Sequence, residues 1–99
     1  MAFKARLLFR SRFVYGDGSI REMVLWELPE KLKGCLHRFK YRLYYGRADG
    51  ICLVRYDNER GKGNHRHIEG NEEPYIFRNV EKLVNDFLAD VDKVRGGKQ

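Results

Sequence analysis

Phe39-Lys40-Tyr41-Arg42-Leu43-Tyr44-Tyr45 is the stretch of this 99-residue sequence from which the rest of the fold can be worked out. Its apolar and polar residues alternate with a period of two, which is the pattern of a half-buried strand. One face carries Phe39, Tyr41, Leu43 and Tyr45, and the other carries Lys40, Arg42 and Tyr44. The stretch therefore predicts a strand within 39–46 of an antiparallel sheet that has one buried face.

Tight-turn signals connect this strand to others of the same kind. Arg47-Ala48-Asp49-Gly50 predicts a hairpin turn into a strand within 50–57, and Gly16-Asp17-Gly18-Ser19 predicts a turn between strands within 3–15 and 19–28. Asp-Gly pairs suit such turns because they accept positive φ angles. Tyr75-Ile76-Phe77 is expected to add a short edge strand. Together these segments predict an antiparallel β-meander of four to five strands.

The C-terminal part of the sequence has the periodicity of an amphipathic helix over 79–95. Asn79 is suited to cap its N-terminus, and Gly96-Gly97 is suited to end it. The apolar residues that recur at helical spacing are Val80, Leu83, Val84, Phe87, Leu88, Val91 and Val94. We expect Leu83, Phe87 and Leu88 in the core, with the helix packed on one face of the sheet. The predicted fold class is α+β, in a single domain over 1–99.

Charge is distributed unevenly along the chain. Residues 1–68 hold 15 Lys and Arg against 7 Asp and Glu, a net +8, whereas residues 69–99 hold 5 against 7, a net −2. A basic part of this kind favours a polyanionic partner such as a nucleic acid. The sequence shows neither an apolar run of membrane-spanning length nor a signal-peptide pattern, so we expect a soluble cytoplasmic protein with no membrane association. Cys35 and Cys52 are expected to be reduced, with Cys52 in the core.

Arg55-Tyr56-Asp57-Asn58-Glu59-Arg60-Gly61-Lys62-Gly63-Asn64-His65-Arg66-His67 is the densest run of chemically active side chains. We expect a functional loop over 57–74, because loops on a rigid scaffold often carry function. The candidates for acid–base catalysis are His65, His67, Asp57 and Glu59. The candidates for nucleic-acid binding are Arg55, Arg60, Lys62 and Arg66 in this run, with Lys40, Arg42 and Tyr44 on the strand before it.

Other interpretations of these residues remain open. The run is equally consistent with a solvated charged loop, and Lys40 and Arg42 with the ordinary solvent side of a sheet. His65, His67 and Asp57 offer three possible metal ligands, but Lys62 and Arg66 oppose a cation and the spacing matches no closed zinc pattern. We therefore expect no metal and no other cofactor. The histidines could also serve to hydrogen-bond the loop to the sheet.

The sequence resembles the TumE family of small bacterial toxin–antitoxin proteins over about Leu7 to Val91. The segments that carry the resemblance are 15–20, 41–46, the run 55–67 quoted above, Glu73-Pro74-Tyr75 and the helix over 80–90. The resemblance implies a toxin encoded beside a helix-turn-helix antitoxin, and small toxins of this kind commonly act on RNA.

Two functions compete on this basis. The first is metal-independent cleavage of RNA, in which the 2′-OH is the nucleophile and His65 and His67 transfer protons, while Asp57 or Glu59 orients an imidazole or acts as the base. Arg60, Lys62 and Arg66 would then offset the charge that develops on the phosphate. The second is a non-catalytic module that binds a nucleic acid or docks the antitoxin through the same basic surface.

Overall fold

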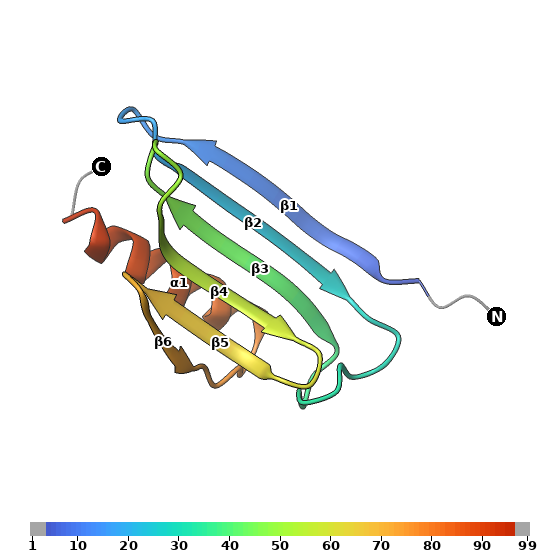
Figure 1. Ribbon diagram of the computed structural model, residues 1–99. Helices are drawn as coiled ribbons and strands as arrows, with labels where there is room; N and C mark the ends of the chain where they lie inside the picture. The colour runs from blue at the N-terminus through green and yellow to red at the C-terminus, as the bar shows by residue number, and fades with distance from the viewer. Residues whose placement is uncertain (1–3, 97–99) are drawn as a thin grey trace.

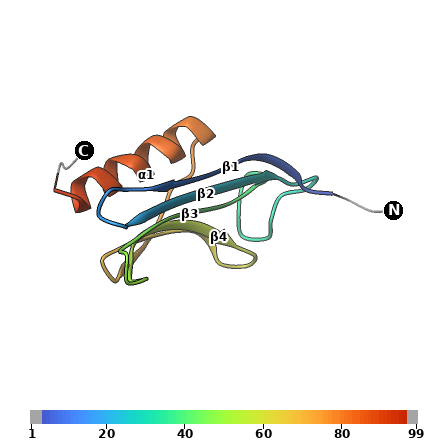
Figure 2. The ribbon, with the colours of Figure 1, turned by 90° about the horizontal axis from the view of Figure 1, so that it is seen from above.

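The computed structural model describes residues 4–96, and within them the chain forms a six-stranded antiparallel sheet with one helix on one face (Figures 1 and 2). Strand order in the sheet follows chain order, as expected for a meander. The elements are β1 (Arg6–Val14), β2 (Ile20–Glu27), β3 (Phe39–Gly46), β4 (Cys52–Glu59), β5 (Gly63–Ile68), β6 (Asn71–Pro74) and α1 (Val80–Val94). The α+β class and the C-terminal helix are confirmed, and the strand count is six where four to five were predicted. The predicted strand start at Phe3 and the stop signal at Gly97 lie outside the described residues.

Both predicted hairpin turns form. In the first, the Tyr15 N–H donates to the Ser19 carbonyl at 2.9 Å, and Gly18 has a φ of +85°. In the second, the Arg47 N–H donates to the Ile51 carbonyl at 2.8 Å. Gly50 has a φ of +92°, a conformation that costs glycine little because it has no Cβ. Local turn chemistry thus fixes the pairing of β1 with β2 and of β3 with β4.

The prediction of a long loop over 57–74 was wrong, because most of this segment is sheet. β4 continues to Glu59, and β5 and β6 follow it as a further hairpin. The turn between them contains two residues, Glu69 with a φ of +47° and Gly70 with a φ of +88°. Two successive positive φ angles are typical of the tightest hairpin turns. The edge strand is therefore β6, and Tyr75-Ile76-Phe77 is an irregular connection to α1.

The core lies between the sheet and α1. Its fully buried members on the sheet include Leu25, Leu43, Val54 and two tyrosines, Tyr41 and Tyr56. From the helix, Leu83, Phe87 and Val91 are fully buried, whereas Leu88 is half-buried at the edge of the contact. Figure 2 shows α1 lying along one side of the sheet. The helix thus seals one face of the sheet and leaves the other without a helix over it.

Side-chain hydrogen bonds hold both ends of α1 in place. The Asn79 Oδ1 accepts from the Lys82 N–H at 2.7 Å, as expected of an N-cap. At the other end the buried Arg95 reaches the β1–β2 turn, where its Nη1 donates to Ser19 Oγ and to the Tyr45 hydroxyl, both at 2.9 Å. Its guanidinium also lies 3.7 Å from the centre of the Tyr15 ring. The last residues of the helix are therefore anchored to the first hairpin.

Within residues 4–96, no helix has the length and apolar character that a membrane crossing requires.

Candidate functional site

We call the face of the sheet opposite α1, which is turned toward the viewer in Figure 1, the open face. Strand residues alternate between the faces, so the neighbours of the buried core residues point to the open face. It carries predicted site residues from three strands together with one residue of β6. These residues are Lys40, Arg42 and Tyr44 on β3, Arg55 and Asp57 on β4, His65 and His67 on β5, and Glu72 on β6. The fold thus brings together residues that the sequence had placed on a strand and in a loop.

Strand register aligns these residues in two neighbouring rows across the sheet. In the first row Arg42 is opposite Asp57, and Asp57 is opposite His65. In the second row Tyr44 is opposite Arg55, Arg55 is opposite His67, and His67 is opposite Glu72. Residues directly opposite on neighbouring strands are close enough for their side chains to interact.

Five of these side chains form one continuous chain of polar contacts. The Asp57 carboxylate lies 3.2 Å from Arg55 Nε, and Arg55 Nη2 lies 2.8 Å from His67 Nε2. The Glu72 carboxylate lies 3.7 Å from His67 Nε2 and 2.9 Å from His65 Nδ1. We call this set, Asp57, Arg55, His67, Glu72 and His65, the histidine network. It alternates carboxylates with groups that are, or can become, positively charged.

The partners of each imidazole fix where its proton lies. An arginine only donates hydrogen bonds, so His67 Nε2 accepts from Arg55 and the proton of His67 is on Nδ1. His65 Nδ1 lies 2.9 Å from the Glu72 carboxylate, which can only accept, so a proton on that nitrogen suits this partner. The remaining nitrogen, His65 Nε2, is buried and has no hydrogen-bond partner in residues 4–96. His65 thus has one nitrogen oriented by a carboxylate and one left for another partner.

Cationic and aromatic side chains flank the histidine network on β3. The Arg42 guanidinium lies 5.2 Å from the centre of the Tyr44 ring, a cation–π distance. Lys40 Nζ donates to the backbone carbonyl of Asn58. Asn58 itself is fully buried, and its side chain bonds the backbone of Phe39 and Tyr41, which joins the ends of β3 and β4. Asn58 is therefore a structural residue within the run that was predicted to be a loop.

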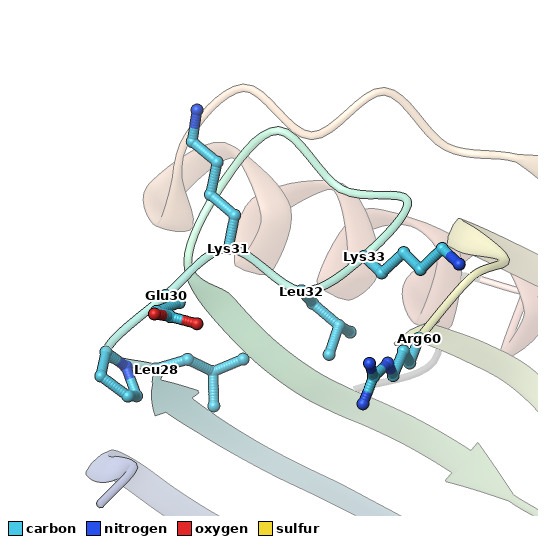
Figure 3. A pocket seen from close by; sticks show the side chains of 7 residues that line it. Leu28, Glu30, Lys31, Leu32, Lys33 and Arg60 are labelled. Atoms are coloured by element: carbon cyan, nitrogen blue, oxygen red, sulfur yellow. The ribbon is translucent and has the colours of Figure 1, made fainter. Parts of the chain in front are cut away.

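Three predicted site residues lie at the β4–β5 turn, away from the histidine network. Lys62 Nζ pairs with Glu59 at 3.4 Å, and both side chains are exposed. Glu59 therefore contacts neither histidine. Arg60 lines a separate cavity of about 320 Å³ together with Leu32 and other residues of the β2–β3 connection (Figure 3). In Figure 3, Arg60 approaches this cavity from the turn, while Lys31 extends away from it.

Arg66 lies on the opposite face from His65 and His67, against α1. Its Nε is 3.2 Å from Asp90 and 3.3 Å from Glu73. Tyr56 donates to the same Asp90 carboxylate, and burial raises the pKa of Tyr56 so that its hydroxyl stays protonated. Arg66 thus connects β5 and β6 to the helix, and its predicted place beside the histidines was wrong. In a strand, neighbouring residues point to opposite faces.

Gly61 and Gly63 serve the packing of the turn. Gly34, in the β2–β3 connection, approaches so closely that a Cβ on it would lie 3.2 Å from the Gly61 carbonyl carbon and from the Gly63 nitrogen. The Gly61 N–H also donates to the Lys33 carbonyl at 2.6 Å. The sequence suggested that these glycines let the backbone bend or approach a ligand. The structure uses them for a sharp turn and for contact between two connections.

Glu72 is the site residue that the sequence prediction missed. It had been included in an acidic, turn-rich segment rather than in a strand. The signal that points toward it is Gly70, since glycine readily supplies one of the positive φ angles of a two-residue hairpin turn. Such a turn places residue 72 opposite residue 67, and so next to His67.

The arrangement of donor side chains bears on metal binding and thiol chemistry. Among residues 4–96, no group of three or more His, Cys, Asp or Glu side chains is arranged to hold a metal ion. Asp57, the third ligand considered from the sequence, contacts Arg55 instead. Cys35 and Cys52 are both free thiols, and burial raises the pKa of Cys52, which disfavours the reactive thiolate.

Comparison with known proteins identifies a family. The family model described as "Toxin TumE" matches residues 4–95, nearly the whole chain. No curated protein and no solved structure matches the chain.

Proposed function

The chain belongs to the TumE family of toxins, and from this premise we propose that it cleaves single-stranded RNA on the open face without a metal ion. We further propose that an antitoxin of the helix-turn-helix class, encoded beside it, neutralises it in the cytoplasm. The observation that carries the proposal is the histidine network. Two imidazoles share one carboxylate, and an arginine lies beside one of them.

The reaction needs a base and an acid, and the two histidines supply them. RNA contains its own nucleophile, the 2′-OH. His65 Nε2 accepts the proton of that hydroxyl while Glu72 holds the Nδ1–H on the other side of the ring. The bond from O2′ to phosphorus forms, and the bond from phosphorus to O5′ breaks. A proton from His67 goes to O5′, so the products are a 2′,3′-cyclic phosphate and a 5′-hydroxyl.

Arg55 couples substrate binding to the protonation of His67. In the free protein Arg55 donates to His67 Nε2, so that nitrogen carries no proton. A substrate phosphate competes for Arg55, because a guanidinium binds phosphate oxygens with two parallel hydrogen bonds. The freed Nε2, which lies 3.7 Å from the Glu72 carboxylate, is then able to take up a proton. Phosphate binding thereby prepares the acid, and Arg55 offsets the charge of the phosphorane.

The remaining open-face residues bind the strand. Arg42 and Lys40 supply positive charge next to the network, and the Tyr44 ring offers a surface for base stacking. Asp57 positions Arg55 through their ion pair. Lys62 and Arg60 add charge at the end of the sheet, and Glu59 has no role in proton transfer in this scheme.

A non-catalytic module that binds RNA or docks the antitoxin is the alternative. It is favoured by one observation: neither Nε2 atom is exposed and free, because that of His65 is buried and that of His67 is bonded to Arg55. Catalysis therefore requires these side chains to move when RNA binds. Binding of RNA without cleavage by the purified protein would establish this alternative.

The decisive experiment uses His65→Gln and His67→Gln, which keep polarity and approximate size but cannot transfer protons. We expect each to reduce cleavage of a labelled single-stranded RNA by about 10²–10⁴-fold while RNA affinity changes by less than about threefold. Gel analysis of the products should show cyclic phosphate ends.

His37→Gln is the matched control, since it removes the third histidine. His37 lies in the β2–β3 connection, where it bonds Asn64 and stacks 3.9 Å from the centre of the Phe77 ring. It should leave the cleavage rate of the folded protein unchanged. Parental activity in both test variants would show that the histidine network is not catalytic.

A further inference from the structure

The open face continues beyond the histidine network to a cavity over β1, β2 and β3. The cavity has a volume of about 260 Å³, and its open-face lining consists of Arg10, Arg12, Glu22, Val24 and Arg42. Strand register explains the grouping: Arg10 is opposite Val24, Val24 is opposite Arg42, and Arg12 is opposite Glu22. We call this the arginine cavity.

The arginine cavity has an excess of positive charge. Arg12 pairs with Glu22 at 3.4 Å. Within residues 4–96, neither Arg10 nor Arg42 has a carboxylate within 4 Å. Three guanidinium groups against one carboxylate leave a net charge of +2 around a single hollow.

The chemistry of the cavity suits a phosphate group. A guanidinium offers five N–H donors in a planar fork that matches phosphate oxygens. Here two of the guanidinium groups start from β1 and the third from β3, on either side of β2, so their backbones are held in fixed register. Val24 lies between two of them and offers no competing acceptor.

Register also relates the cavity to the histidine network. Arg42 is opposite Asp57, which is opposite His65, so the cavity is on the same row as His65. Neighbouring strands lie about 4.8 Å apart, which places β3 about 10 Å from β5. β1 lies four spacings, about 19 Å, from β5, so one phosphate cannot contact both His65 and the β1 arginines, and the distance suits two phosphates of one strand.

We propose that the arginine cavity binds a backbone phosphate of single-stranded RNA next to the phosphate held by the histidine network. RNA then crosses the strands of the sheet from β5 toward β1. This inference rests on the proposed function, since it takes the nucleic acid at the histidines as given.

The test measures binding of 2′-O-methyl oligoribonucleotides, in which the nucleophile is blocked, as a function of length and salt. The test variant is Arg10→Gln/Arg12→Gln, and both side chains are exposed. For the parent, affinity should rise when the oligonucleotide becomes long enough to reach the cavity. The double variant should lose that rise, and its slope of log affinity against log salt should be shallower by about 0.7, since each phosphate contact on a single strand contributes about 0.7 and the cavity binds one phosphate.

Lys93→Gln/Lys82→Gln is the matched control, because it removes two exposed charges from α1 on the other side of the sheet. If the Arg10→Gln/Arg12→Gln variant matches this control at every length, the proposed subsite is refuted. It is equally refuted if the arginine variant weakens antitoxin binding alone, since the cavity would then serve a protein partner.

The outcomes separate this inference from the proposed function. Length-dependent binding through the cavity without cleavage of unmodified RNA would retain the subsite and refute the nuclease. Cleavage by the parent with unchanged binding by the arginine variant would retain the nuclease and refute the subsite.

Discussion

A single carboxylate decides the geometry of the candidate site at the scale of residues. Glu72 contacts both imidazoles, whereas Asp57 and Glu59, the carboxylates proposed from the sequence, pair with Arg55 and Lys62. An imidazole with one nitrogen held by a carboxylate keeps one tautomer and one ring orientation, and this is what a general base needs. In the proposed reaction Glu72 is thus a positioning residue, since it would act on substrate through His65 and His67.

Glu72→Gln should reduce RNA cleavage by about tenfold or more, as part of the 10²–10⁴-fold that acid–base catalysis contributes, with unchanged RNA affinity. The amide keeps the shape of the side chain but removes the carboxylate that lies beside both imidazoles. Single-turnover cleavage with excess enzyme separates this effect from binding.

Glu73→Gln provides the control because Glu73 is the next residue of β6 and pairs with Arg66 on the covered face. Like Glu72→Gln, this change removes one negative charge from β6, but at the next residue of the strand. Equal activity in the two variants would show that net charge, and not orientation of the histidines, is what matters.

At the scale of elements, α1 decides which face of the sheet is available. Leu83, Phe87 and Val91 lie on one stripe of the helix and are fully buried. Because the stripe covers the aromatic face of β3 and β4, the basic face stays open. The helix therefore determines the location of the candidate site without contributing a side chain to it.

The apolar side chains of α1 contribute unequally to the free energy of unfolding. Phe87→Ala should lower it by about 3–5 kcal/mol, because the change leaves a cavity in a closed core. Leu88→Ala should cost less than about 2 kcal/mol, since Leu88 is half-buried and water can fill the space. Urea denaturation followed by circular dichroism measures both values.

The exposed Asn85 supplies the reference, and Asn85→Ala should change stability by less than about 0.5 kcal/mol. If the urea midpoint of Phe87→Ala equals that of Asn85→Ala, the helix does not pack on the sheet as described.

At the scale of the whole molecule, Arg95 joins the end of the described chain to its beginning. It bonds Ser19, Tyr45 and Asp17, the last at 3.3 Å, so it bridges 78 positions of sequence. Hydrogen bonds from Ser19, and then the charge and hydrogen bond of Arg95, hold the pKa of Asp17 below its usual value. The Asp17 carboxylate is therefore ionised at neutral pH, and its favourable contacts are lost when the pH falls through the lowered pKa.

Arg95→Met should destabilise the protein by about 1–3 kcal/mol, because it leaves the buried hydroxyl oxygen of Tyr45 without its donor and removes one of the two donors to Ser19 Oγ. Lys93→Met, an exposed change in the same helical turn, should have little effect. Urea midpoints at pH 7 compare the two variants. Equal midpoints would show that the Arg95 cluster does not hold the helix to the first hairpin.

The sequence by itself determined the elements whose signals are local. The alternation in 39–46 placed Tyr41, Leu43 and Tyr45 on one face and Lys40, Arg42 and Tyr44 on the other, and Asp-Gly turns fixed the hairpins beside it. The cap at Asn79 and the spacing of Leu83 and Phe87 gave the helix its limits and its buried stripe. These features depend on backbone geometry and side-chain spacing within a few residues. They can therefore be predicted from the sequence without knowledge of long-range contacts.

Only the tertiary structure decided the assembly of the site. β5 is polar on both faces, so it has no hydrophobic alternation from which to predict a strand. Its inward-facing Asn64 and Arg66 find partners from distant segments, Tyr41 and Asp90. Pairing across the sheet then selected Glu72 over Asp57 and Glu59, moved Arg66 away from the histidines, and placed Arg10 and Arg12 beside Arg42. The physical reason is that contacts between segments far apart in sequence depend on strand order and register, which are properties of the packed sheet and not of any one stretch of residues.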